Sequence, residues 1–289
     1  MPGIRTVMAI MSDAQSGEAP LRVALQVAQS LDCFLEAYHV RADPSQAVPY
    51  VGEAMGGSMV EDMVSSADKE AHDLAKQTRA LFDAKVAEAG LSQDPITPAP
   101  GATGARWVEE PGVECDSVAL RGRVADLIVM GRPGQKGAPP SLMTLNAALM
   151  ESGRPVLVAP PQPVDAVGSS IVVGWNGSAE AARAIVDAIP FMAQAKQVTI
   201  LLAEESEATS EPTALMEHLA WHGIQAQTRI LVAPPGSRTG EALLKAAEEV
   251  SADLLVMGAY THSRLRQLIL GGVTRYVLER ATLPVLFAH

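Results

Sequence analysis

One heptapeptide occurs twice in the chain, in nearly the same form. It reads ADLIVMG at residues 125–131 and ADLLVMG at residues 252–258. Each copy is followed, at nearly the same distance, by a second matching segment, RPVLV at 154–158 and LPVLF at 283–287. Two matches in the same order indicate that one unit has been duplicated. The long period predicts two tandem domains rather than a solenoid, because each unit is long enough to bury its own core.

A proline-rich segment separates the two units. Residues 160–163 read PPQP. Proline fixes φ and lacks a backbone N–H, so this segment can neither join a sheet interior nor continue a helix. We therefore expect an N-terminal domain over residues 1–160 and a C-terminal domain over residues 168–289. A length of 289 residues suits two domains.

Short aliphatic segments alternate with helical patterns in the C-terminal unit. The expected strands are 171–174, 198–203, 228–232, 254–257 and 284–287. The expected helices are 179–188, ended by Pro190, then 213–222, 240–250 and 273–280. Strands this apolar are typical of parallel sheets that helices cover on both faces. The pattern predicts an α/β fold with an open, parallel, five-stranded, Rossmann-like sheet, whose ligands bind at the carboxyl ends of the strands.

The N-terminal unit repeats this plan and adds an insert. Its expected strands are 6–11, 34–40, 106–108, 126–130 and 155–158. The insert spans residues 43–89: its first part is rich in Pro, Gly and Met, and residues 59–89 have the pattern of one long helix. This segment either covers a ligand site or a partner surface, or it is an elongated surface helix. The predicted architecture is two tandem five-stranded sheets.

Composition and charge restrict the classes of partner. The net charge of −11 disfavours nonspecific binding to nucleic acid or to anionic lipid. No apolar run approaches the roughly 20 residues of a membrane helix, and the first residues do not resemble a secretory signal. The two cysteines, Cys33 and Cys115, have neither metal nor redox spacing. We therefore expect a cytoplasmic protein without a nucleic-acid or membrane partner.

The second copy of the heptapeptide leads into the strongest candidate site. Its strand ends at Gly258, and Gly271 and Gly272 open the next expected helix, followed by Val273 and Thr274. Backbone amides at a helix N-terminus, with a hydroxyl nearby, are a common way to hold a phosphate. The sequence therefore predicts an anion site at this turn.

Polar residues near this turn allow two interpretations. Arg264 could fork onto phosphate oxygens and His262 could donate to them, or both could belong to a solvated face beside the leucines around them. Asn176 follows the first strand of the C-terminal unit. It offers an amide at the carboxyl edge of the sheet, or it serves only the strand-to-helix turn.

Two other patterns favour structural roles. After Gly131 the N-terminal unit lacks a glycine pair, and prolines interrupt the approach to Thr144, so its phosphate loop is degenerate and a structural or dimer-forming role is favoured. His218 and His222 stand four residues apart, which is metal-ligand spacing. Since no third ligand is evident, an exposed helix face is favoured there.

These features together resemble a tandem, two-domain bacterial universal stress protein. The likeness rests on the tandem plan, the strand ending at Gly258, the helix start at 271–274 and the ending at 283–286. Nucleotide-binding members of that family carry a glycine, two residues, a glycine, nine residues, and then glycine with serine or threonine. Here Thr261 replaces the second glycine and Gly272 replaces the hydroxyl residue, although Thr274 keeps a hydroxyl close by. Asn176 stands where the family has an aspartate.

The resemblance implies a fold like that of the adenine nucleotide alpha hydrolases and a nucleotide site in the C-terminal domain. The adenine would lie near Asn176 and Ala203. The phosphates would lie against Gly258, Gly271, Gly272, Val273 and Thr274, with magnesium accompanying them. No carboxylate cage for the metal is evident in the sequence.

Three hypotheses follow. The first is a stress-response or regulatory protein that binds an adenine nucleotide, ATP, without a catalytic residue. The second is a slow ATP hydrolase, for which the sequence offers neither a Walker motif nor an evident base beside the loop. The third is a nucleotide-free scaffold whose final strand, at 284–287, pairs within the chain as a pseudo-dimer or between chains as a homodimer.

Overall fold

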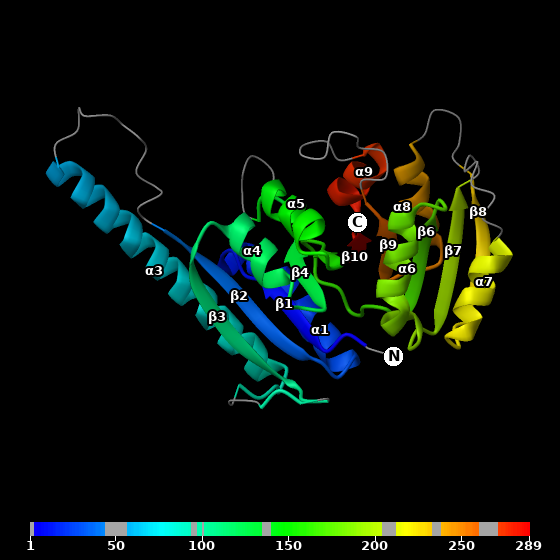
Figure 1. The fold of residues 1–289 in the computed structure, drawn as a ribbon, viewed down its shortest axis with the longest axis horizontal. Coiled ribbons are helices and arrows are strands. Elements are labelled where there is room, and N and C mark those ends of the chain that lie inside the picture. The colour runs from blue at the N-terminus through cyan, green and yellow to red at the C-terminus, as the bar shows by residue number, and fades with distance from the viewer. Residues whose placement is uncertain are drawn as a thin grey trace.

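The computed structural model describes most of the chain, as an α/β fold with a central, mostly parallel sheet. The described residues are 3–43, 57–93, 97–99, 101–134, 140–203, 212–232, 238–259 and 271–289. Helices cover both faces of the sheet (Figure 1). None of the described helices combines the length and the apolar character needed to cross a lipid bilayer.

Strands and helices alternate in both halves of the chain. The N-terminal half contains β1 (Thr6–Ile10), α1 (Ala14–Ser30), β2 (Phe34–Ala42), α3 (Gly57–Glu88), β3 (Gly104–Gly112), α4 (Glu114–Gly122), β4 (Leu127–Gly131), α5 (Leu142–Glu151) and β5 (Val156–Ala159). The C-terminal half contains β6 (Ser170–Trp175), α6 (Ala179–Met192), β7 (Gln197–Ala203), α7 (Pro212–Trp221), β8 (Gln227–Leu231), α8 (Thr239–Glu249), β9 (Leu254–Gly258), α9 (Gly272–Arg280) and β10 (Val285–Ala288).

The two expected sheets are joined into one. The strand order is β3-β2-β1-β4-β5-β10-β9-β6-β7-β8, and all neighbours are parallel except β5 and β10. In that antiparallel pair Val285 lies opposite Val158, and Phe287 lies opposite Val156. Both strands are fully buried, because each covers the edge that the other would expose. The final strand therefore joins the two halves within one chain.

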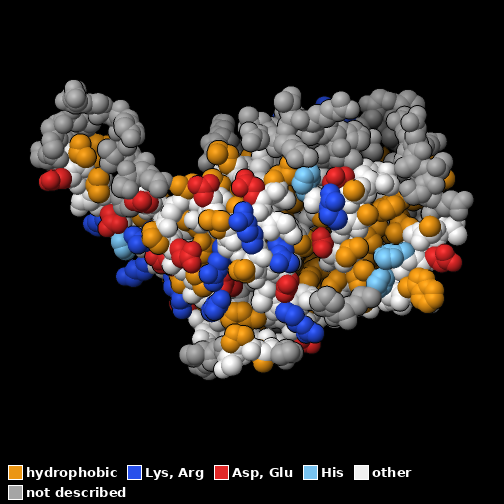
Figure 2. Space-filling view, in the orientation of Figure 1, with side chains coloured by type: hydrophobic (Ala, Val, Ile, Leu, Met, Phe, Trp, Pro, Cys, Tyr) orange, Lys and Arg blue, Asp and Glu red, His pale blue; other side chains and the backbone are white. Residues whose placement is uncertain are grey.

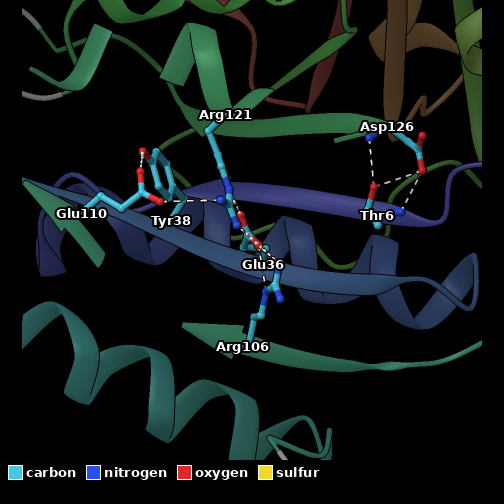
Figure 3. A network of polar contacts seen from close by, with 7 residues as sticks. All are labelled: Thr6, Glu36, Tyr38, Arg106, Glu110, Arg121 and Asp126. Carbon is cyan, nitrogen blue, oxygen red and sulfur yellow. Dashed lines mark hydrogen bonds and ion pairs between the residues drawn. The ribbon is translucent and has the colours of Figure 1, made fainter. Parts of the chain in front are cut away.

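The repeated Ala-Asp dipeptide has the same role in both halves. The carboxylate of Asp126 accepts hydrogen bonds from the backbone N–H and the hydroxyl of Thr6, at 3.0 and 3.1 Å (Figure 3). The carboxylate of Asp253 accepts hydrogen bonds from the N–H groups of Ser169 and Ser170, both at 3.0 Å. Asp126 thus links the start of β4 to the start of β1, and Asp253 links the start of β9 to the start of β6. This shared contact explains why the dipeptide recurs.

Helix α6 does not end before Pro190. It continues to Met192 with the proline inside it. A proline inside a helix removes one hydrogen bond and costs about 3 kcal/mol. Phe191 and Met192 are both almost fully buried, and burying two such side chains offsets a cost of that size. Core packing therefore outweighs the local stop signal.

The long helix of the insert packs on its own half. Phe82 and Val86 of α3 are fully buried, and the helix contacts α1, β2 and β3. Further towards the helix N-terminus, Met63 and Leu74 are 42% and 40% exposed, so that end lacks such cover. Most of the Pro- and Gly-rich lead-in lies outside the described residues. Strand β3 is much longer than the expected 106–108, because it pairs with β2 along its whole length.

We expect the ionisation of Asp187 on α6 to make the stability of the protein depend on pH. Burial raises its pKa to about 6, against the opposing influence of Arg154 and Arg183. In the unfolded chain the pKa of Asp187 has its ordinary, lower value. Ionisation of Asp187 therefore begins to oppose folding as the pH rises above about 4. The full loss of folding free energy is present above about pH 6. Because the carboxyl group is only partly buried, we expect the free energy of unfolding of the wild type to fall by about 1 kcal/mol relative to Asp187→Asn between pH 5 and pH 8. Urea midpoints of both proteins at the two pH values check this, and parallel curves would contradict it.

Candidate functional site: the carboxyl edge of the C-terminal half

Three neighbouring parallel strands end at the same edge of the C-terminal half. β6 pairs with β7 on one side and with β9 on the other. Asn176 follows β6, while Ala203 ends β7 and Gly258 ends β9. This is the edge where the sequence predicted a ligand. His262 and Arg264, the other two polar candidates, lie outside the described residues, as does Thr261.

The N-terminus of α9 is open among the described residues. Gly271 is the N-cap residue, with φ −55° and ψ 147°, which is backbone that any residue adopts. A Cβ atom built on Gly271 or on Gly272 would meet nothing within 4 Å. Neither the described packing nor the backbone geometry therefore requires glycine at these two positions. Val273 is partly packed against the core, and Thr274, at 5% exposure, is the most buried of the predicted phosphate contacts.

The corresponding helix of the N-terminal half is closed by its own side chains. Ser141, the N-cap residue of α5, accepts a hydrogen bond from the N–H of Thr144 at 3.0 Å. The hydroxyl of Thr144 in turn donates to Glu114 at 2.7 Å. The Ser141 hydroxyl thus already accepts from a backbone N–H that could otherwise bind an anion. The carboxylate of Glu114 lies nearby and would repel an anion. The N-termini of α5 and α9 thus differ in their caps, and the degeneracy of the N-terminal phosphate loop stays a prediction.

Gly258 is close to the first turn of α6. A Cβ on Gly258 would lie 2.6 Å from the backbone nitrogen of Ala181 and 2.7 Å from the carbonyl carbon of Glu180. Backbone cannot yield as a flexible side chain can. The sequence pattern indicates Gly258 only as a phosphate contact, and the structure adds a steric requirement that no local pattern reveals.

Asn176 has the local role that one of its two interpretations predicted. Its side-chain oxygen accepts a hydrogen bond from the N–H of Ser178 at 3.1 Å. The hydroxyl of Ser178 accepts a hydrogen bond from the N–H of Ala181 at 3.1 Å and so caps α6. Asn176 is also exposed, so its amide N–H₂ group lies at the surface of the sheet edge.

A groove that the sequence analysis missed adjoins the open helix end. Its volume is about 600 Å³, and its walls come from the N-terminal end of α8 and from one side of α9. It is lined by Arg238, Thr239, Gly240, Gly272, Val273, Arg275, Tyr276 and Glu279. Two helix N-termini and two guanidinium groups therefore border one hollow, with Glu279 as the acidic side chain of the lining, so the lining carries a net positive charge. Arginines next to predicted helix starts were the signal that could have revealed it.

The two arginines of this groove are held differently. The Arg238 guanidinium lies 5.9 Å from the ring centre of Tyr276, within range of a cation–π contact. Arg275 donates from Nε to Glu279 at 2.8 Å. That hydrogen bond raises the pKa of Arg275 and lowers the pKa of Glu279. Since both partners are largely exposed, the ion pair is weak and a stronger anion could displace Glu279.

A metal site of three protein ligands was not predicted here. Among the described residues, no group of three or more His, Cys, Asp or Glu side chains is arranged to hold a metal ion.

Comparisons with known proteins agree with the fold and with the sequence pattern. Residues 203–289 match the model of the Universal stress protein family. A universal stress protein from Synechocystis is 25% identical over 170 residues, which cover 56% of this chain and 57% of the relative. The chain thus spans a little over half the length of that curated relative.

Two solved structures share the fold along nearly the whole chain. A universal stress protein from Archaeoglobus fulgidus has a TM-score of 0.68 at 15% identity, covering 98% of this chain and 97% of its own. A functionally unknown protein from Pseudomonas aeruginosa has a TM-score of 0.54 at 15% identity, covering 99% and 92%. Residues 203–289 thus match the universal stress protein family, and the whole chain has the fold of a solved universal stress protein.

Proposed function

We propose that this chain is a stress-response protein that binds an adenine nucleotide, ATP, at the carboxyl edge of its C-terminal half. One observation carries the proposal. The N-terminus of α9 begins with two glycines that have no steric neighbour among the described residues, and it borders an electropositive groove. Helix N-termini of this kind hold phosphate through backbone N–H groups and the helix dipole.

The charges around this helix end favour a polyanion. Arg238 and Arg275 border the groove, and Gly271 has no side chain that could cap the helix. A triphosphate carries several negative charges in a row, so it would gain from the dipole of α9 and from both guanidinium groups. Arg275 would then exchange Glu279 for a phosphate oxygen.

The proposed place of the adenine rests on the resemblance to the universal stress protein family and is supported by strand geometry. The ends of β6 and β7 lie side by side, so an adenine placed near Asn176 and Ala203 would lie at the same edge as the phosphates. Asn176 in place of an aspartate would recognise the nucleoside by hydrogen bonding rather than by charge. Magnesium would be bound with the phosphates.

Titration of ATP into the full chain, followed by calorimetry, tests this proposal. We expect saturable binding by the wild type and at least tenfold weaker binding by Gly271→Val, because the added side chain would occupy the place of the phosphates. Gly3→Val is the matched control, since a Cβ added to Gly3 would also meet nothing within 4 Å and Gly3 lies far from α9 in the sequence. Absence of binding by the wild type, or equal affinities of wild type and Gly271→Val, would refute the proposal.

The scaffold hypothesis has support of its own. The antiparallel pairing of β5 with β10 joins the two halves in a pseudo-dimeric arrangement. This arrangement is compatible with nucleotide binding, so the two roles do not compete. If native protein showed neither copurified nucleotide nor a thermal shift with ATP, the scaffold role would be favoured. Release of phosphate in a single-turnover assay would favour the hydrolase instead.

A further inference from the structure

Two histidines at the end of α7 lie against each other on the surface, away from the proposed nucleotide site. The ring centres of His218 and His222 are 4.9 Å apart and the ring planes meet at 72°. His222 directly follows the last residue of the helix, and its N–H donates to the carbonyl of Leu219 at 2.9 Å. His218 is exposed and His222 is partly buried. Figure 2 shows histidine side chains gathered at the surface beside a hydrophobic area.

One ring nitrogen of this pair has no partner among the described residues. The Nδ1 atom of His222 is buried and makes no hydrogen bond with them. A buried nitrogen of this kind destabilises the fold unless some group satisfies it. The His218 ring lies edge-on to the His222 ring, and the side chain of His218 is exposed.

The spacing of the two rings suits a shared metal ion. Two metal–nitrogen bonds of about 2.0–2.1 Å at a tetrahedral angle place the two nitrogens about 3.4 Å apart. Rings with centres 4.9 Å apart reach that separation by small side-chain rotations. Neutral imidazole is a preferred ligand of Zn²⁺, Cu²⁺ and Ni²⁺, whereas Mg²⁺ and Ca²⁺ prefer oxygen.

The electrostatic surroundings favour a cation. The pair lies at the C-terminus of α7, where the helix dipole is negative. The sequence has no Lys or Arg between residues 212 and 228, and Glu217 is adjacent to His218. The net charge of the chain is −11. No fixed positive charge of this helix would therefore repel a metal ion.

We propose that His218 and His222 form a binding site for a divalent transition metal ion of the Zn²⁺, Cu²⁺ and Ni²⁺ class. The two imidazoles supply the protein ligands, and water fills the remaining positions. The site is independent of the nucleotide proposal, because α7 contributes no residue to the groove beside α9.

Calorimetric titration of Zn²⁺ into the full chain without nucleotide tests this site. We expect one equivalent bound by the wild type, and at least tenfold weaker binding by His218→Asn and by His222→Asn, because each change leaves a single imidazole. His72→Asn is the matched control, since His72 is an exposed histidine on another helix. Affinities within twofold of the wild type for both α7 variants, or an equal loss in His72→Asn, would overturn the proposal.

A second readout locates the ion even if one variant folds poorly. Trp221 lies between the two histidines in the sequence and is 86% exposed. Bound Cu²⁺ should quench its fluorescence, so the wild type should lose emission at low Cu²⁺ concentration and Trp221→Phe should lose far less. Equal fractional quenching of the two proteins would place the copper elsewhere.

Discussion

A Gly258→Ala variant is expected to lose about 3 kcal/mol of unfolding free energy, the upper part of the range for overpacking a core. The new methyl group would lie 2.6 Å from the backbone nitrogen of Ala181. To relieve this clash, the first turn of α6 would have to move away from β9. That movement would disturb the packing of α6 on both β9 and β10. Denaturant unfolding, followed by circular dichroism, measures the loss as a lower midpoint with an unchanged slope.

Gly272→Ala is the matched control from the same strand–helix unit. Its Cβ position has no neighbour within 4 Å among the described residues, and it lies in the first turn of α9. Alanine is the better helix former, so we expect no loss of stability and a gain of up to about 1 kcal/mol. Equal destabilisation by the two substitutions would show that contact with α6 does not determine the glycine at position 258.

A Glu36→Gln variant is expected to lose about 2 kcal/mol of unfolding free energy, because it leaves two guanidinium groups without their carboxylate. Glu36 accepts hydrogen bonds from Nε of Arg106 and from Nε of Arg121, both at 2.8 Å (Figure 3). Its side chain is only 12% exposed. Arg106 is largely exposed, which is why the expected loss lies below that of a fully buried pair.

The loss should depend on pH in one direction. Burial acts to raise the pKa of Glu36, but the hydrogen bonds from Arg121 and Arg106 outweigh it and hold the pKa below its ordinary value. A depressed carboxyl pKa contributes stability above the unfolded value, about 4.3, and that stability is lost as the pH falls through the folded value. The difference between wild type and Glu36→Gln should therefore shrink in acid. Glu18→Gln, which removes an exposed ion pair with Arg22, should cost less than about 0.5 kcal/mol, and a similar cost for both would contradict the account.

The repeated heptapeptide and the alternation of apolar segments predicted much of the fold. Both features depend on a local pattern that occurs once in each half of the chain. Pairing of the final strand within the chain was one of the alternatives that the family resemblance offered, but its partner β5 could not be derived from periodicity, because an edge strand and an internal strand have the same apolar sequence. The continuation of α6 past Pro190 was missed for a related reason. The burial of Phe191 and Met192 is a tertiary effect.

The candidate site was only partly visible in the sequence. Gly271 and Gly272 were identified because glycine at a helix start has a clear local meaning. The steric role of Gly258 depends on where α6 lies, and the groove depends on two helices that are distant in sequence, so neither follows from a motif. The contrast between the capped helix α5 and the open helix α9 likewise required the cap contacts of Ser141.

The most direct test of the nucleotide proposal is an NMR titration of the full chain labelled with ¹⁵N-glycine. The amide signals of Gly271 and Gly272 are identified from their loss in Gly271→Ala and Gly272→Ala. We predict that ATP shifts both signals, and that adenosine, which lacks the phosphates, leaves them nearly unchanged. If saturating ATP left both signals in place, the phosphates would not lie on the N-terminus of α9, and the assignment of the site would be wrong.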